Sequence, residues 1–290
     1  MVGSACRTPE IQLTCPICGF PTGKSRPLRG YSVWRCAGCG HEHLLDGPPA
    51  PNFLYDDSYF TGTTEVGYDD YPALEAGVRR AARSRITIME RWMGPAAHRR
   101  RLLDVGAAYG YFLDEARAGF AGAGIEPAPA AAAHARNDLR LDVWTGNLEN
   151  AAIAPGSLDV VTLWDVIEHL ADPLDALTRV RTLLRTDGWI FLTTGDRSAP
   201  LARLAGDRWH LYNLPEHLHC FSRASLARAL ESSGFTVHGI TYPSNYFPIR
   251  YYPERLTKLL APKARRRPLP ITAVLPVNLW DIMLVGARVS

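Results

Sequence analysis

The sequence predicts an α/β fold in which a doubly wound, mostly parallel sheet follows a small four-cysteine zinc ribbon. Short apolar segments alternate with segments of helical spacing, and this alternation is typical of a parallel sheet with helices on both faces. A buried-strand pattern at Leu102–Val105 leads through a glycine-rich turn into a helical pattern from Tyr111. Two Cys-x-x-Cys pairs precede this region and predict the ribbon.

The composition is that of an ordinary globular protein. The chain has 290 residues, of which 47% are hydrophobic and 21% are charged, enough for one large domain with a small appendage. The formal net charge of +3 is too small to argue for a nucleic-acid partner. No apolar run approaches the length of a membrane span, and Met1–Glu10 lacks the apolar core of a signal peptide. We therefore expect a cytoplasmic protein without a membrane partner, whose cysteines are thiols or metal ligands.

Four of the six cysteines form two knuckles, Cys15-x-x-Cys18 and Cys36-x-x-Cys39, each followed by a glycine. The glycine lets the loop turn so that both sulfur atoms point inward. Tyr31–Cys36 is expected to be a strand that leads into the second knuckle. Four thiolates at this spacing suit a tetrahedral structural zinc, and the competing interpretation is a set of free or disulfide-paired cysteines.

These patterns divide the chain into a zinc ribbon at 1–50, a linker or lid segment at 51–73 and a main domain at 74–290. Gly47–Pro51 is rich in proline, which predicts a stiff and extended link. Asn52–Pro72 is rich in tyrosine and aspartate. This stretch is either a lid that packs over a ligand cleft or an irregular connection on the surface.

The main domain is expected to begin with a helix over 74–93 and then to alternate strands with helices. Apolar runs that end in glycine or polar residues mark the strands, and helical spacing marks the segments between them. The expected strands lie at 102–105, 122–126, 141–145, 158–163, 188–194, 235–242 and 278–289, and the expected helices at 110–119, 128–137, 172–185 and 223–233.

The strand–loop–helix unit Asp104-x-Gly106-x-Ala108-x-Gly110 predicts a ligand site. In such a unit the free N–H groups at the helix N-terminus face a ligand over the carboxyl end of the strand. Glu126 ends the next apolar run. A carboxylate in that place can accept hydrogen bonds from both ribose hydroxyls of an adenosine. The spacing is not the G-x-G-x-x-G of a dinucleotide site.

These residues resemble motifs I and II of class I S-adenosylmethionine-dependent methyltransferases, whose pattern is D/E-x-G-x-G-x-G followed by an acidic residue. Ala108 replaces the middle glycine, which leaves less room for the backbone to approach the ligand. The segment Ser157–Leu170 resembles the fourth-strand region of the same family, and the resemblance extends from about residue 82 to the C-terminus. It implies a Rossmann-like sheet and S-adenosylmethionine as the cofactor.

The resemblance also implies that the cofactor lies across the ends of successive strands. Asn147 follows the third strand and offers a carbonyl acceptor near the adenine amino group, although Gly-Asn is also a common turn. Trp164 and Asp165 follow the fourth strand and border the methionine end of the cofactor, with Asp165 also expected to be the N-cap of a helix. The implied cofactor-binding residues are Asp104, Gly106, Ala107, Gly110, Glu126, Asn147, Leu148, Trp164 and Asp165.

Histidines and carboxylates gather after the fourth strand and again before the last helix. Glu168 and His169 are expected to share a helical face with Asp165. His217 and His219 lie in a segment expected on the opposite side of the same cleft. An unperturbed imidazole titrates near neutrality, so one of these histidines can deprotonate a substrate hydroxyl, and His217 is our choice. The alternative is that these histidines are structural hydrogen-bonding residues.

A metal-assisted variant of this chemistry is also open. Some methyltransferases of this fold hold a divalent ion with an E-x-x-E-H motif and a later histidine. Asp165-x-x-Glu168-His169 together with His217 is similar to that set, with aspartate in place of the first glutamate. A basic run at Arg250–Arg267 is either a solvated surface or an attraction for a phosphorylated or nucleotide-linked substrate.

The sequence therefore predicts S-adenosylmethionine-dependent methylation of a small biosynthetic intermediate, at an oxygen of a sugar or natural-product acceptor. The ribbon also resembles that of sugar-nucleotide C-methyltransferases, whose further C-terminal domain has no counterpart in this sequence. One rival function is metal-assisted RNA methylation, which salt-dependent RNA binding would support. The other rival is a non-catalytic scaffold, which would bind the cofactor without turnover.

Overall fold

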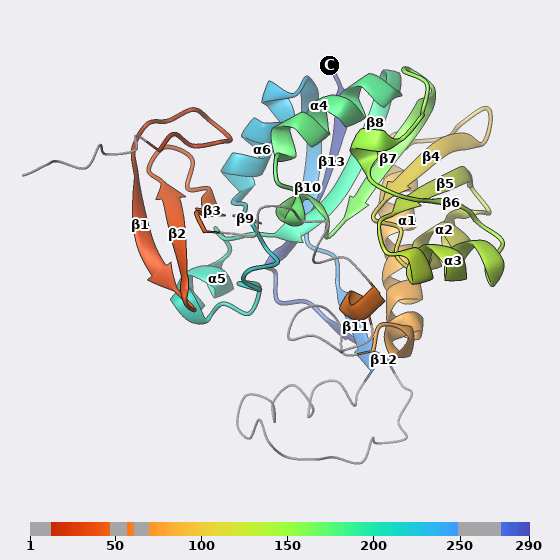
Figure 1. Ribbon diagram of the computed structural model, residues 1–290. Helices are drawn as coiled ribbons and strands as arrows, with labels where there is room; N and C mark the ends of the chain where they lie inside the picture. Colours follow the sequence, from red (N-terminus) through yellow and green to blue (C-terminus); the bar gives the residue numbers. More distant parts are fainter. Residues whose placement is uncertain (1–12, 47–56, 61–69, 249–273) are drawn as a thin grey trace, which may run out of the picture.

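A seven-stranded sheet forms the centre of the computed structural model, which describes residues 13–46, 57–60, 70–248 and 274–290 (Figure 1). Its strands are β4 (Arg100–Val105), β5 (Phe120–Glu126), β6 (Asp142–Thr145), β7 (Leu158–Trp164), β8 (Leu184–Gly195), β10 (Phe235–Thr241) and β13 (Ile282–Val289). Their order is β10-β13-β8-β7-β4-β5-β6. The strands from β4 to β8 are parallel, and β13 pairs antiparallel with both β8 and β10.

Helices cover both faces of this sheet (Figure 1). The helices are α1 (Glu75–Met93), α2 (Tyr111–Ala116), α3 (Pro129–Asn137), α4 (Pro173–Leu183), α5 (Pro200–Ala205) and α6 (Arg223–Ser232). On β7, Val161 and Leu163 belong to the core that contains α4 and α6. Val160 and Trp164, on the other face of that strand, belong to the core that contains α1, α2 and α3. All seven residues of β7 are buried, as expected for a central parallel strand, and five of them are apolar.

The ribbon adds a second sheet with the order β1-β2-β3-β9. Its strands are β1 (Gly23–Leu28), β2 (Tyr31–Cys36), β3 (Glu42–Leu44) and β9 (His219–Cys220). The last of these strands comes from the main domain, close before α6. Ribbon residues also join two hydrophobic clusters of the main domain. Trp34 packs in the core with α4 and α6, and Val33 packs in a separate cluster with Trp209. The ribbon and the main domain therefore share their hydrophobic interior.

Short elements complete the described chain. A two-stranded sheet pairs β11 (Asn245–Pro248) with β12 (Val274–Val277). The 3-10 helices are η2 (Asp57–Phe60), η3 (Pro72–Leu74), η4 (Leu148–Asn150), η5 (Ile167–His169) and η6 (Gly206–Arg208). The predicted linker Gly47–Pro51, the basic run Arg250–Arg267 and most of the predicted lid lie outside the described residues. Within the lid segment, Tyr59 and Phe60 are buried against α3 and the glycine loop.

The predicted elements match the observed ones with differences mainly at their ends. The predicted helix at 110–119 ends already at Ala116, because the chain must turn there to enter β5 at Phe120. The last strand begins at Ile282 rather than at residue 278, since Trp280 has a left-handed backbone with φ of 57°. Strands β1, β3 and β9, the β11–β12 pair and α5 were not predicted.

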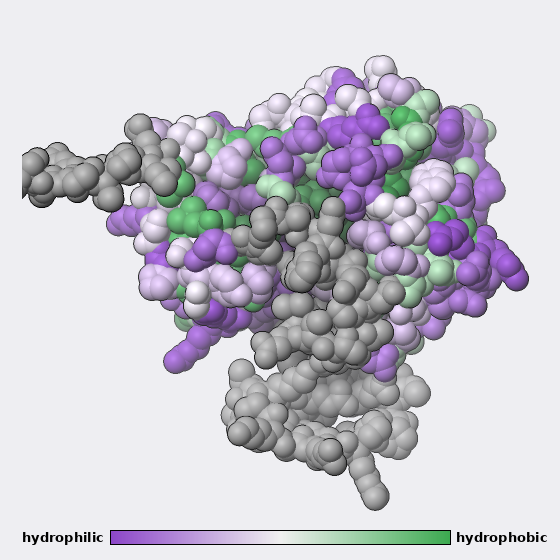
Figure 2. Space-filling view, viewed as in Figure 1, coloured by the Kyte–Doolittle hydropathy of each residue, from purple (hydrophilic) through white to green (hydrophobic). Residues whose placement is uncertain are grey.

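The described residues contain no helix long and apolar enough to cross a membrane. The face of the molecule in Figure 2 is mostly hydrophilic where described residues show, and its hydrophobic areas there are small and separate.

Candidate active site and metal centre

The turn between β4 and α2 is a tight loop that needs glycine at both ends. Gly106 has φ of 76°, and a Cβ atom there would lie 2.6 Å from Cγ2 of Val166. Gly110 has φ of 83°, and its Cβ would lie 2.6 Å from a methyl group of Leu141. Any side chain at either position would be strained and would collide with its neighbours. The loop backbone can therefore approach a ligand as closely as this fold requires.

Ala108, which replaces the expected middle glycine, also has a left-handed backbone, with φ of 48°. Its N–H group donates to Oε2 of Glu126 at 2.7 Å. This hydrogen bond holds the residue in a conformation that costs an L-residue about 1–2 kcal/mol. The loop thus keeps the glycine geometry in spite of the extra methyl group.

Glu126 lies at the carboxyl end of β5 with only 3% of its surface exposed. Besides the bond from Ala108, its Oε1 accepts the N–H of Ala128 at 2.9 Å. Burial raises the pKa of the Glu126 carboxyl to about 7, against the two backbone hydrogen bonds, which lower it. The neighbouring turn is tied to the same place, because Gly146 N–H donates to the Glu126 carbonyl at 3.0 Å. Asn147, the next residue, therefore lies at the adjoining strand end.

Leu148, the other residue predicted in that turn, has its side chain in the core. It is 4% exposed, so only its backbone is available to a ligand. Ala107 is likewise buried, and its N–H donates to the Ile125 carbonyl at 3.0 Å.

Asp104 lies at the carboxyl end of β4, beneath the glycine loop. Its Oδ1 accepts the hydroxyl of Thr162 at 2.6 Å, and the carboxyl is 1% exposed. Burial raises the pKa of Asp104 to about 7, while the Thr162 hydrogen bond and the charge of Arg85 lower it. Asp104 is thus a buried acid that also orders the neighbouring strand β7.

Arg85 on α1 is a candidate functional residue that the sequence interpretation missed. Its guanidinium lies 4.8 Å above the Trp164 ring, and its Nη2 is 3.1 Å from Oδ2 of Asp165. The side chain is only 12% exposed. Nothing distinguishes this arginine from the others of α1 in the sequence, because only the packing of α1 against the sheet brings it to the end of β7.

The turn after β7 differs from the prediction. Asp165 is not a helix N-cap, because its φ is 56° and the 3-10 helix η5 begins two residues later with Val166 in the cap position. Its backbone N–H donates to the Thr193 hydroxyl at 3.0 Å. The expected helical face of Asp165, Glu168 and His169 is therefore absent, since the chain forms a single 3-10 turn instead of an α-helix.

Glu168, His169 and His217 nevertheless come together. Each offers a ligand atom within 4.8 Å of the others, and the rings of His169 and His217 are 4.7 Å apart in an edge-to-face contact. Nδ1 of His169 lies 3.0 Å from the Glu216 carbonyl. Oε2 of Glu168 is buried and has no hydrogen-bond partner in the described structure. A buried carboxyl oxygen without a hydrogen bond lowers the stability of the fold, which makes this cluster a candidate functional site rather than a purely structural one.

Burial sets the protonation of the three groups. It raises the pKa of Glu168 to about 8, with the charge of Asp165 as a second cause. It lowers the pKa of His169 to about 4. Burial, and then repulsion from His169, hold the pKa of His217 well below its usual range. Both imidazoles are therefore neutral at pH 7 and can accept a proton or ligate a cation.

His219 lies elsewhere, although it is only two residues from His217. Its Nδ1 is 3.1 Å from Nε2 of His41, and the backbone around it pairs with β3 of the ribbon. His43 is the third ring of this group, and burial lowers the pKa of all three histidines. Residues two apart in a regular strand would share a face, but β9 begins only at His219 and His217 lies before it, just after the turn at 214–216. The structure thus brings three of the four predicted catalytic residues together and places the fourth at the ribbon interface.

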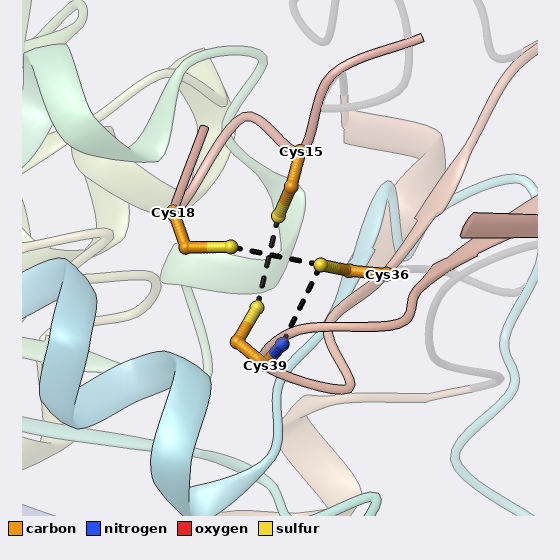
Figure 3. A group of neighbouring side chains, drawn as sticks. All are labelled: Cys15, Cys18, Cys36 and Cys39. Atoms are coloured by element: carbon orange, nitrogen blue, oxygen red, sulfur yellow. Dashed lines mark hydrogen bonds between the residues drawn. The ribbon is translucent and has the colours of Figure 1, made fainter. Parts of the chain in front are cut away.

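The four knuckle cysteines form a compact group (Figure 3). Cys15 Sγ and Cys39 Sγ are 3.7 Å apart, and Cys18 Sγ and Cys36 Sγ are 3.6 Å apart. Tetrahedral zinc with Zn–S bonds of about 2.3 Å needs sulfur atoms about 3.8 Å apart. None of these cysteines forms a disulfide. The sulfur positions therefore fit a closed zinc site and contradict the disulfide interpretation.

Comparison with known proteins agrees with this geometry. The sequence model of the methyltransferase domain family matches residues 74–239, which is more than half of the chain. The ubiquinone biosynthesis O-methyltransferase of Albidiferax ferrireducens is 32% identical over 160 residues, which are 49% of this chain and 63% of that protein. The enzyme of the same name from Aeromonas salmonicida is 31% identical over 169 residues, 52% of this chain and 71% of that protein. The match thus covers less than two thirds of the length of the Albidiferax ferrireducens enzyme.

Solved structures show the same fold at low sequence identity. A S-adenosylmethionine-dependent methyltransferase from Archaeoglobus fulgidus superposes with a TM-score of 0.51 at 15% identity, covering 75% of this chain and 98% of that one. The cyclase SpnF gives 0.50 at 16% identity, covering 75% and 93%. Since a cyclase is among these structures, they support the fold alone. The family match decides the assignment: the chain belongs to the methyltransferase domain family.

Proposed function

We propose that this enzyme transfers the methyl group of S-adenosylmethionine to a hydroxyl of a small biosynthetic intermediate. The observation that carries the proposal is the cluster of Glu168 and His169, which follow β7, with His217, which precedes β9. Val166, between that cluster and Asp165, touches the glycine loop at Gly106, so the two groups of residues adjoin. The O-methyltransferase relatives support oxygen as the methylated atom.

The cofactor would lie over the ends of β4, β5 and β6. The loop Gly106–Gly110 forms the cradle, in which Ala107 and Ala108 contribute backbone, and Glu126 accepts the ribose hydroxyls. Asn147 faces the adenine, with the backbone of Leu148 beside it. Asp104, Trp164 and Asp165 border the methionine end. Arg85 is the nearby cation that suits the methionine carboxylate.

S-adenosylmethionine supplies an electrophilic methyl group on a sulfonium, and the protein must align the acceptor oxygen and remove its proton. His217, which lies in the cluster, is our candidate to accept that proton. Burial keeps the imidazole neutral and therefore ready as a base. Glu168, whose raised pKa of about 8 keeps it largely protonated at pH 7, and His169 adjoin it.

A second candidate for this cluster is a divalent cation that binds the acceptor hydroxyl. One carboxylate and two neutral imidazoles within 4.8 Å of one another form a ligand set suited to a transition metal such as zinc or manganese. The ion would lower the pKa of the hydroxyl, and the three residues would then be its ligands.

We also propose that Cys15, Cys18, Cys36 and Cys39 hold one structural zinc. Four sulfur ligands complete the tetrahedron, so this site would bind no water and take no part in the chemistry. N–H groups of the second knuckle point at Cys36 Sγ from Gly38 at 3.3 Å and from Cys39 at 3.5 Å, which favours the thiolate. On this proposal, residues 1–50 form the ribbon, 51–73 the linker or lid, and 74–290 the methyltransferase domain.

The test begins with the purified protein, methyl-labelled S-adenosylmethionine and a panel of phenols, catechols and sugars as acceptors. We expect label in an ether product, no turnover in His217→Ala and retained turnover in the control variant His98→Ala, whose exposed side chain precedes β4 at the end opposite the glycine loop. Full activity after mild chelation that leaves one zinc per chain supports the base, whereas activity lost at that zinc content and restored by an added divalent ion supports the metal. Equal turnover in wild type and His217→Ala would overturn the assignment.

A further inference from the structure

The segment that carries His217 is held by the ribbon. In the described chain, β9 pairs with β3 and with no other strand. The pairing places His43 opposite His219, and the N–H of Leu44 donates to the Leu218 carbonyl at 2.9 Å. Leu218 is the residue directly after His217. The backbone beside the candidate base is therefore bonded to the ribbon.

A buried charge on the same ribbon strand reaches into the main domain. Glu42 in β3 is 0% exposed. Its Oε2 accepts the hydroxyl of Tyr212 at 2.5 Å and Nη2 of Arg26 at 3.2 Å, and its Oε1 is 3.4 Å from Nε of Arg197. Burying a carboxylate costs several kcal/mol unless it is well paired. Arg26 and, at 3.7 Å, Arg35 of the ribbon compensate part of this charge, and the main domain supplies the other two partners, so the full set forms only when the two parts are joined.

Tyr212 and Arg197 also bind the loop that contains His217. Arg197 Nε donates to the Tyr212 hydroxyl at 2.5 Å, and the backbone N–H of Arg197 donates to the Phe221 carbonyl at 2.8 Å. The two contacts hold both ends of the segment 212–221. His217 lies between them, where its N–H donates to the Asn213 carbonyl at 2.8 Å.

A second ribbon arginine supports the beginning of the loop. Arg29 donates to the carbonyl of Tyr212 at 2.5 Å and to that of Trp209 at 3.2 Å. Trp209 in turn donates from Nε1 to Asp281 at 2.8 Å, at the start of β13. The loop is thus fixed between the ribbon and the large sheet.

We propose that Glu42 is a positioning residue for methyl transfer: through Tyr212 and Arg197, the ribbon holds the loop 212–221 and so places His217 against Glu168 and His169. On this proposal the ribbon positions a residue of the active site. This inference rests on the proposed role of His217. The contacts of Glu42 with the loop are independent of that role.

Glu42→Gln tests this in the full chain, since it keeps the side-chain shape and an acceptor oxygen but removes the charge. We expect amides of 213–221 to exchange hydrogen roughly tenfold faster or more, while those of 104–126 exchange as before. We expect turnover to fall roughly 10- to 100-fold, as for a displaced catalytic group, with affinity for S-adenosylhomocysteine within about twofold of wild type.

Asp46→Asn is the matched control. Asp46 is also a ribbon acid, and its carboxylate accepts the N–H of Ser32 at 2.8 Å without touching the main domain. It should leave exchange in 213–221 and turnover unchanged. Equal effects of the two variants, or unchanged exchange in Glu42→Gln, would overturn the proposal. Faster exchange with full turnover would overturn it as well, because positioning would then not matter.

Tyr212→Phe is the second variant, for the case that Glu42→Gln does not fold. It keeps the buried ring and removes only the hydroxyl that joins Glu42 to Arg197. This variant should also show faster exchange in 213–221 and lower turnover, with smaller effects than Glu42→Gln. Exchange and turnover equal to those of the wild type would count against the proposal. If wild-type enzyme methylates no acceptor, the proposed function fails, yet the exchange comparison still decides whether Glu42 holds the loop.

Discussion

The two halves of the candidate site lie at the same edge of the sheet but are assembled differently. The glycine cradle and the ribose-binding carboxylate of the cofactor half fall within Asp104–Glu126, a single β-α-β unit. The acceptor half joins Glu168 and His169 to His217 from a distant loop, and Glu42 of the ribbon braces that loop. Local chain geometry therefore builds one half, while long-range packing builds the other. Changes in the ribbon should affect the acceptor half and spare the cofactor half.

The largest effect should follow from Cys36→Ser, which removes one of four ligands from the proposed zinc site. Binding of a structural zinc contributes roughly 10–16 kcal/mol in small zinc domains, so the ribbon should lose both metal and structure. Turnover should fall with it, while affinity for S-adenosylhomocysteine is retained. Elemental analysis and calorimetry check both halves of this comparison, and wild-type protein without zinc would refute the site.

Glu126→Ala should damage the cofactor half alone. Each lost hydrogen bond to the carboxylate costs roughly 1.5–3 kcal/mol, so cofactor affinity should fall at least about tenfold. Turnover at saturating cofactor should change little, because the acceptor half is untouched. Glu126→Gln, which keeps an acceptor oxygen, should lose less. Calorimetry that finds unchanged affinity in the alanine variant would remove Glu126 from the site.

Cofactor binding should also depend on pH. Burial raises the pKa of Glu126 to about 7, and ribose hydroxyls donate best to the ionised form, so affinity should rise between pH 6 and about 7.5 and then level. The raised pKa values of Glu126 and Asp104 stabilise the free protein below the ordinary carboxyl range, and this stability is lost as pH rises through about 7. Titration calorimetry in buffers of different ionisation enthalpy would detect the released proton. Binding without proton release at pH 6.5 would contradict this.

Ala108→Gly should produce the smallest effect. Glycine relieves the left-handed strain at φ of 48° but increases the entropy of the unfolded chain, so the net stabilisation should be about 0.5–1 kcal/mol. Denaturant unfolding measures it, with cofactor affinity equal to or tighter than wild type. A loss of stability would mean that the methyl group packs usefully in the loop.

Residues of both halves were predicted from the sequence: the local half from its spacing, and Glu168, His169 and His217 as a group of histidines and a carboxylate. Gly106, Gly110 and Glu126 were predicted from spacing, because the glycines of the turn and the carboxylate at the strand end each follow a short apolar run. The four zinc-site cysteines were predicted from their spacing as well. Their proposed roles still await the tests above.

Arg85 and Glu42 could not be predicted in this way. Each acquires its partners only when α1 or the ribbon packs against the main domain, and each is an ordinary charged residue in its own segment. The prediction that Asp165 begins a helix after β7 was wrong for a related reason. The backbone N–H of Asp165 donates to the hydroxyl of Thr193 in β8, a contact across the sheet. Sequence spacing carries no information on such contacts.

A crystal structure with S-adenosylhomocysteine bound tests the central claim most directly. The account predicts the ribose hydroxyls at the carboxylate of Glu126, the methionine carboxylate at Arg85, and the sulfur facing a space that Glu168, His169 and His217 border. A product cofactor bound away from Glu126, or a sulfur separated from His217 by packed side chains, would contradict it.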